Sequence, residues 1–340
     1  LGYPPRERLF PILKQLNSQQ HSNKKLPGGA TSPWTERGPS NVGGRTRAIM
    51  FDPNAASGNK VWAGGVTGGL WYTNDITDAS STWVSVDDFW NNIAITCIAY
   101  DPNDSQVFYV GTGEGWGAGA SRGAGIWKTS DGGASWAQLT STSGFYYVND
   151  IVVRNETGTS AIYAAVDGRY YSGSWHGVST FGLQRSTNGG TSWTQVMPNI
   201  SGQPYSPADI SIASDNRIWI GSKKNPYGNG GGSILYSDNG TSWTLAHNHS
   251  NGGRVAIAAA PSDANYVYAL IEANYKLDAV VNTTNQGASW SYKNEPDATA
   301  TGMSSDDFTR GQAWYDLVIE VDPNDKNTIY AGGIDLFKSS

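Results

Sequence analysis

The sequence predicts an all-β fold, a β-propeller of four-stranded sheets, and two observations support this prediction. The 340-residue chain contains 42 Gly, 14 Trp and 18 Tyr, and only 15% of its residues are charged. This composition is typical of short strands joined by tight turns rather than of amphipathic helices. In addition, a phrase of about 50 residues repeats from residue 34 onward, and this period is typical of propeller blades.

Each copy of the repeat presents the same features in the same order. A turn such as Asp-Pro-Asn leads into a strand that ends in small residues, and a variable loop follows. A further strand and a turn rich in Asp, Asn and Gly then lead to a tryptophan that opens the last strand. The closing tryptophans of the five full copies are Trp83, Trp136, Trp193, Trp243 and Trp290. A sixth copy, "VDPNDKNTIYAGGIDLFKSS", is partial.

The two ends of the chain are interpreted separately. Residues 1–33 are flanked by Pro and rich in basic and amide side chains, so we interpret them as an extension beside a propeller that occupies residues 34–340. Trp34 to Arg37 resembles a fourth strand without its first three, and we expect it to close the ring. The expected total is seven or more blades, the last one completed by a longer product or by a second chain.

The turn before each closing tryptophan follows a pattern shown by "KTSDGGASW", "STNGGTSW", "YSDNGTSW" and "TTNQGASW". An Asp or Asn oxygen can accept backbone hydrogen bonds in such a turn, Gly permits positive φ, and the tryptophan can pack between neighbouring sheets. Because Asn replaces Asp in two copies, we expect a structural role rather than acid/base chemistry. The residues expected in this role are Asp131, Asn188, Asp238 and Asn285, with Trp136, Trp193, Trp243 and Trp290.

This pattern, Ser/Thr-x-Asp-x-Gly-x-Ser/Thr-Trp, resembles the Asp-box or BNR repeat of sialidases, xyloglucan-hydrolysing enzymes and sortilin. The likeness covers about residues 34–340. The opening "GPSNVGGRTRAIMFDPN" is also similar to that of large exported Bacteroidetes-type proteins labelled glycosyl hydrolases. The resemblance implies a propeller, and together with the low content of charged residues it favours a secreted or cell-surface location.

Composition argues against several other classes of protein. A formal net charge of −6, without basic clusters beyond two Lys-Lys pairs, argues against nucleic-acid binding. No apolar run approaches the roughly 20 residues that span a bilayer. The single cysteine, Cys97, lies in the apolar run "AITCIAY" and is expected to be buried. The four histidines show no zinc spacing, so we expect no metal and no other cofactor.

The loops expected on the face opposite the Asp-box turns are long and aromatic. Flat rings stack on sugars while neighbouring polar groups bind the hydroxyls, so this mixture is typical of a glycan groove. The alternative is that the rings pack the loops onto one another. The candidate ligand-binding residues are Trp90, Trp116, Tyr146, Tyr147, Tyr170, Trp175 and Trp314, with Tyr171, Tyr205, Tyr227 and Tyr275 in the same loops.

Carboxylates recur where second strands end. Glu114, Asp167 and Glu272 occupy this position in three copies, and Asp335 lies near the same register in the sixth. Glycoside hydrolysis requires a pair of carboxyl groups, one as acid and the other as base or nucleophile. These residues are therefore the catalytic candidates.

The resemblance does not carry over to all of the known catalytic motifs. Xyloglucan-hydrolysing enzymes place a catalytic Asp in a "TDVGG"-like segment, where this chain has "GGVTGG" with Val66 and Thr67. The sialidase entry arginine is also absent, and Arg45 and Arg47 are its nearest substitutes. Two hypotheses follow. The first is an exported protein that binds a glycan or a protein partner through its aromatic loops, and the alternative is a glycoside hydrolase of the xyloglucanase or sialidase type.

Overall fold

The computed structural model describes residues 45–87, 90, 94–116, 120–296 and 307–339. The expected extension at residues 1–33 and the expected ring-closing strand at Trp34 to Arg37 lie outside this part of the chain. Within it, the regular structure is β apart from two short helical segments, η2 (Thr140–Thr142) and α2 (Ala313–Asp316). The all-β prediction is confirmed.

The described residues form six antiparallel sheets, five of four strands and one of three, with two small hairpins besides. The first sheet contains β1 (Thr46–Phe51), β2 (Val61–Gly65), β3 (Gly69–Thr73) and β4 (Val84–Ser85). The second contains β5 (Ile95–Asp101), β6 (Asp104–Thr112), β7 (Ile126–Thr129) and β8 (Ala137–Gln138). The third contains β9 (Tyr147–Glu156), β10 (Thr159–Asp167), β13 (Gly182–Ser186) and β14 (Thr194–Gln195).

The later sheets repeat this order. The fourth contains β17 (Ser206–Ile212), β18 (Ile218–Lys223), β19 (Ser233–Ser237) and β20 (Thr244–Asn248), and the fifth contains β21 (Val255–Ala259), β22 (Val267–Ala273), β23 (Lys276–Thr283) and β24 (Ser291–Lys293). The sixth contains β25 (Val318–Val321), β26 (Ile329–Gly332) and β27 (Leu336–Lys338). The hairpins are β11 (Arg169–Tyr171) with β12 (Ser174–His176), and β15 (Asn199–Ile200) with β16 (Gln203–Pro204).

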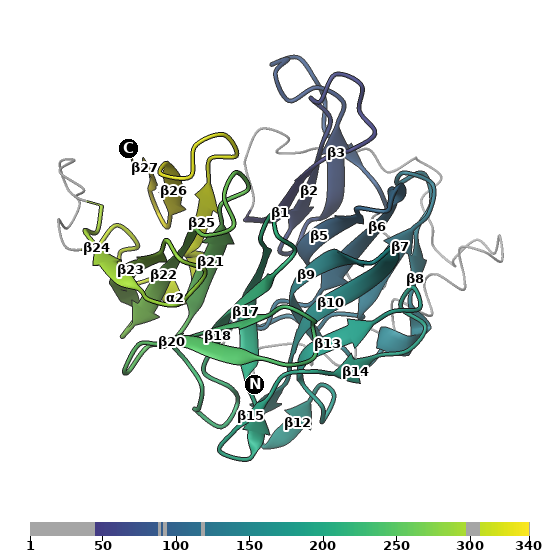
Figure 1. Cartoon of the computed structure of the whole chain (residues 1–340). Helices are drawn as coiled ribbons and strands as arrows, with labels where there is room; N and C mark the ends of the chain where they lie inside the picture. Colours follow the sequence, from purple (N-terminus) through teal and green to yellow (C-terminus); the bar gives the residue numbers. More distant parts are fainter. Residues whose placement is uncertain (1–44, 88–89, 91–93, 117–119, 297–306, 340) are drawn as a thin grey trace.

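The six sheets are arranged as the blades of a propeller. Their first strands, β1, β5, β9, β17, β21 and β25, pack against one another in chain order. The sheets therefore follow one another around a common axis, as Figure 1 shows. This arrangement confirms a propeller of four-stranded blades, whereas a total of seven or more blades stays a prediction.

The hydrophobic core lies between neighbouring blades. Trp62 and Leu70 of the first sheet form one cluster with Phe108 and Val110 of the second, and these side chains are almost fully buried. Cys97 belongs to the next cluster, between the second and third sheets, and it is buried as expected. Burial raises the pKa of its thiol. The core therefore holds the blades to one another.

Three of the Asp-box turns have the expected hydrogen bonds. Asp131 Oδ1 accepts bonds from Thr129 Oγ1 at 2.6 Å and from the Ser135 backbone N–H at 2.8 Å. Asn188 Oδ1 accepts equivalent bonds from Ser186 Oγ at 2.9 Å and from the Ser192 N–H at 3.0 Å. The Asn285 turn repeats the arrangement. An amide oxygen replaces a carboxylate oxygen here because the turn needs only an acceptor.

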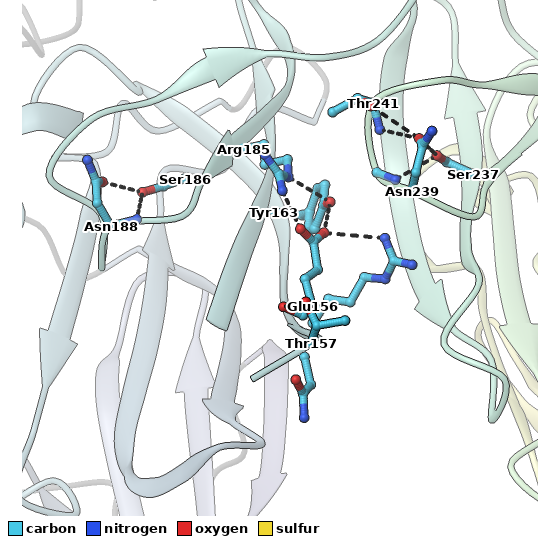
Figure 2. Close-up of polar contacts among 12 residues, drawn as sticks. Glu156, Thr157, Tyr163, Arg185, Ser186, Asn188, Ser237, Asn239 and Thr241 are labelled. Atoms are coloured by element: carbon cyan, nitrogen blue, oxygen red, sulfur yellow. Dashed lines mark hydrogen bonds and ion pairs between the residues drawn. The ribbon is translucent and has the colours of Figure 1, made fainter. Parts of the chain in front are cut away.

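The fourth turn differs from the expectation, because its acceptor is Asn239 rather than Asp238. Asn239 Oδ1 accepts the N–H groups of Thr241 and Ser242 at 2.9 and 2.8 Å, and Figure 2 shows it between Ser237 and Thr241. The Asp238 carboxylate instead forms an ion pair with Arg217 at 2.7 Å.

The closing tryptophans pack between blades. Trp136 contacts Trp62 of the preceding sheet with 6.0 Å between ring centroids, and Trp290 contacts Trp219 of its preceding sheet at the same distance. Trp193 and Trp243 pack against the clusters on either side of the third sheet. These contacts agree with a structural role for the four tryptophans, which stays a prediction.

Candidate functional site

The antiparallel order of the strands places two sets of loops on the same face of the propeller. These are the loops between second and third strands and the loops that enter each first strand. The Asp-box turns, which join third to fourth strands, lie at the opposite ends of the sheets. The face that carries the candidate ligand-binding loops is therefore separate from the structural turns.

Two adjoining hollows open on this face, with volumes of about 340 and 260 Å³. They adjoin because Gly115, Lys223 and Lys224 line both. We call the combined depression the loop-face groove. Its remaining lining residues are Trp116, Asp167, Gly168, Arg169, Tyr170, Pro226, Gly253, Arg254, Glu272, Asn274, Tyr275 and Trp314.

Asp167 lies in the smaller hollow, at the end of β10. Its side chain forms an ion pair with Lys223, which ends β18 of the next blade. Oδ1 also accepts hydrogen bonds from Ser206 Oγ and from the Gly168 N–H, both at 3.0 Å. These contacts hold the carboxylate in one place between two blades.

Glu272 lies in the larger hollow and is held by backbone groups. Oε2 accepts the N–H of Arg254 at 3.0 Å, and Oε1 accepts the N–H of Tyr275 at 2.8 Å. Tyr275 adopts a positive φ of 73°, and its side chain is 66% exposed. A side chain at Gly253 would collide with Glu272, since an added Cβ would meet Oε2 at 1.8 Å. The glycine therefore allows the carboxylate to approach the chain.

Trp116 is buried at the groove floor and is surrounded by cations from three other blades. Lys223 Nζ lies 4.8 Å from its ring centroid, and the guanidinium carbons of Arg47 and Arg254 lie at 5.2 and 4.6 Å. Both arginines also donate to the Tyr315 carbonyl, at 2.7 and 2.6 Å. Burial, followed by repulsion from Arg47, lowers the pKa of Arg254 to about 9.

Glu114, the remaining catalytic candidate, does not line either hollow. It is buried, and among the described residues its Oε1 has no hydrogen-bond partner. Burial raises its pKa, while the positive charges of Arg47 and Arg45 oppose that effect. Asp335 is also outside the groove, where it forms an ion pair with Arg310 at 3.2 Å. Of the four carboxylates, Asp167 and Glu272 therefore line the groove, one in each hollow.

The aromatic candidates divide between the groove and the interior. Trp116, Tyr170, Tyr275 and Trp314 line the groove, and Trp175 supports Tyr170 with 5.2 Å between ring centroids. Trp90 and Tyr147 are instead buried and line neither hollow. Trp90 stacks on Trp127 at 4.5 Å within the core between the first two blades.

The other predicted rings are placed as follows. Tyr146 is half-buried under the guanidinium of Arg122, which lies 3.5 Å from its ring centroid. Tyr205 is buried, whereas Tyr171 and Tyr227 are exposed beside the groove lining. The burial of Tyr205 thus agrees with the alternative that rings in these loops pack the loops onto one another.

Sequence analysis did not single out several residues that shape the groove. Arg254 begins the strand region of the fifth blade and Lys223 ends a strand in the fourth, yet both reach Trp116 of the second. Asp316, next to Tyr315, is another such residue, and burial raises the pKa of its carboxyl group to about 6. These basic residues and Trp116 lie in different repeats, so their positions in the sequence do not show that they are neighbours in the structure.

Chemically, the groove offers two fixed carboxylates, four basic side chains and several rings. In the part of the chain that the structure describes, no group of three or more His, Cys, Asp or Glu side chains is arranged to hold a metal ion. Among the same residues no helix is long and apolar enough to cross a membrane. The arrangement suits a polar, ring-shaped ligand.

Comparison with known proteins relates this chain to xyloglucan-degrading enzymes. A probable oligoxyloglucan-reducing end-specific xyloglucanase of Neosartorya fischeri is 26% identical over 201 residues, which cover 51% of this chain and 23% of the relative. A Paenibacillus xyloglucanase is 30% identical over 187 residues, which cover 48% of this chain and 15% of the relative. No family model matches the chain.

Solved structures show the same fold. The Niastella koreensis GH74 enzyme has a TM-score of 0.60 and 21% identity, and the match covers 86% of this chain and 44% of that one. YCF48 bound to the D1 peptide has a TM-score of 0.50 and 18% identity, over 84% of this chain and 74% of that one. At these identities the likeness concerns the fold alone. The matches to the curated relatives span about a quarter of their length or less.

Proposed function

We propose that this protein is a glycoside hydrolase that acts on a polysaccharide and holds it in the loop-face groove. One observation carries the proposal, namely that Asp167 and Glu272 line adjoining hollows together with four aromatic side chains. Rings that stack on sugars beside carboxylates are the combination that polysaccharide hydrolysis uses. The similarity to xyloglucanases supports the hydrolase hypothesis over a protein that only binds.

Asp167 and Glu272 are the proposed reacting pair. Hydrolysis needs one carboxylic acid that donates its proton to the leaving glycosidic oxygen, and one carboxylate that attacks the anomeric carbon or takes a proton from the attacking water. The ion pair with Lys223 suits Asp167 to the carboxylate role. The proton donor is then Glu272, which two backbone N–H groups hold in place. Glu114 is not assigned to the pair because it lines neither hollow.

A polymeric substrate also agrees with a location outside the cell. Residues from blades two to five line the groove, and a polysaccharide is a substrate encountered outside cells. We therefore propose that the protein is secreted or displayed at the cell surface.

The test is hydrolysis of a polysaccharide panel that includes xyloglucan, with released oligosaccharides measured by chromatography. Asp167→Asn and Glu272→Gln should each lower the rate by about 100-fold or more, the range expected for loss of an acid/base group. Asp335→Asn is the matched control, because Asp335 occupies the corresponding position of the sixth blade but lies outside the groove. It should leave the rate unchanged.

Binding without release would favour the alternative hypothesis, a protein that only binds its glycan or partner. Equal losses in Asp335→Asn and Asp167→Asn would show that these carboxylates matter for folding rather than for chemistry. Thermal unfolding of each variant separates the two cases.

A further inference from the structure

The loop-face groove carries positive charge although the whole chain has a net charge of −6. Its lining includes Arg169, Lys223, Lys224 and Arg254, against the carboxylates Asp167 and Glu272. Basic side chains therefore outnumber acidic ones in the groove, whereas acidic ones prevail in the chain. A local excess of positive charge in the groove attracts anionic ligands.

The two carboxylates are already occupied. Asp167 is paired with Lys223, and both oxygens of Glu272 accept backbone N–H groups. A ligand that enters the groove therefore meets Lys224, and it meets Arg254 beside the carboxylates of Asp209, Asp316 and Glu272. Each of these carboxylates also carries fewer free acceptor positions for a sugar hydroxyl.

Lys224 is the most accessible of the cations. It is exposed, it lines both hollows, and it forms no ion pair with a described residue. Its stem passes Gly231, where an added Cβ would lie 2.7 Å from Lys224 Cγ. The absence of a side chain at Gly231 therefore leaves room for the lysine to follow the groove wall.

Arg254 adds a second cation beside the ring of Trp116. Its Nη1 donates to the Tyr315 carbonyl, while its Nε is buried and has no partner among the described residues. The guanidinium and the Lys223 ammonium both lie within 5 Å of the Trp116 centroid, at 4.6 and 4.8 Å. Cations and a flat ring are thus presented together at the point where the hollows meet.

We propose that the groove recognises an anionic glycan, in which a sugar carboxylate or sulfate pairs with Lys224 and Arg254 while a neighbouring ring stacks on the aromatic wall. This proposal rests on the proposed function and specifies its substrate class. Guanidinium and ammonium groups pair with carboxylates by charge-assisted hydrogen bonds, and a neutral glycan has no group that needs them. A uronate-containing polysaccharide fits this requirement.

The test compares charged glycans with neutral ones, and one pair, an acid and its methyl ester, shares the same sugar backbone. Binding of oligogalacturonate to the intact chain is measured by calorimetry beside its methyl ester, a sulfated galactan oligosaccharide and a xyloglucan oligosaccharide. We expect the charged sugars to bind at least about threefold more tightly than the methyl ester, as one exposed ion pair permits. The advantage should fall as NaCl is raised, because salt screens exposed charges.

Lys224→Gln should weaken binding of the charged ligand by about three- to tenfold and leave the methyl ester unaffected. Lys293→Gln removes the same charge from the exposed outer strand β24 and should change neither. The tighter of uronate and sulfate identifies the anion.

Equal affinity for the ester and the acid, or hydrolysis of neutral glycans alone, would overturn this inference and leave the proposed function standing. Failure to bind or cleave any glycan in either panel would overturn both.

Discussion

In the fourth Asp-box turn the neighbouring residues Asp238 and Asn239 have different roles, and the sequence alone does not show which of them accepts the hydrogen bonds of the turn. Asn239→Ala removes an oxygen that accepts two backbone N–H groups, at 2.9 and 2.8 Å, and contacts from two hydroxyls at 3.2 Å. Loss of such a cap costs about 1–2 kcal/mol of the free energy of unfolding. Asp238→Ala removes only the ion pair with Arg217.

The Asp238 carboxylate is 67% exposed, and Arg217 keeps its bond to the Gln286 carbonyl at 2.8 Å. An exposed pair contributes about 0–1 kcal/mol, so the alanine at 238 should be the milder variant. Urea unfolding followed by tryptophan fluorescence measures the difference, and the Asn239 variant should also melt roughly 1 to 3 °C lower. If Asp238→Ala destabilises the protein as much as Asn239→Ala, the assignment of Asn239 as the cap is incorrect.

Three further predictions concern packing, pH and reactivity. Gly240→Ala should lower the free energy of unfolding by roughly 3 kcal/mol or more. The new Cβ would meet Tyr163 Oη at 1.6 Å, in the network with Glu156 and Arg185 drawn in Figure 2. Gly228→Ala, at a similar φ with open space around it, is the control, and chemical denaturation measures both variants. Burial raises the pKa of Asp316 from 3.8 to about 6, so ionisation of its carboxyl group opposes folding. The contribution of Asp316 to stability should therefore fall as pH rises between these values. Asp316→Asn should remove this contribution from the dependence of melting temperature on pH, and an unchanged dependence would contradict the assignment. Cys97 should resist thiol reagents until the protein unfolds, since it is buried and its pKa is raised; rapid labelling of the folded protein would show that the core between the second and third blades opens.

The sequence predicts the blades well because each blade repeats the same local chemistry. Trp136 and Asp131 perform the same tasks as Trp290 and Asn285, and repetition makes such local signals visible. The error at Asp238 has a simple cause. Its turn is one residue shorter than that of Asp131, so counting back from the tryptophan gives Asp238, while counting forward from Ser237 gives Asn239. The hydrogen bond from Ser237 sets the register.

The groove was only partly predictable because it combines residues from different copies. Strand ends pointed to Asp167 and Glu272, and loop composition pointed to Trp116, Tyr170 and Trp314, all of which line the groove. Loop composition also suggested Trp90, which is buried in a stack on Trp127 that the local sequence does not show. The cations around Trp116 come from blades one, four and five, and only closure of the fold brings them together.

The packing of each closing tryptophan on the preceding blade affects how the propeller unfolds. Trp136 belongs to the second blade but rests on Trp62 of the first, and Trp290 of the fifth rests on Trp219 of the fourth. Loss of one blade therefore uncovers the tryptophan of the blade that follows it. In repeat arrays with nearest-neighbour coupling, such an asymmetry gives unfolding a direction. A lesion in one blade should therefore destabilise the blade that follows it more than the blade that precedes it.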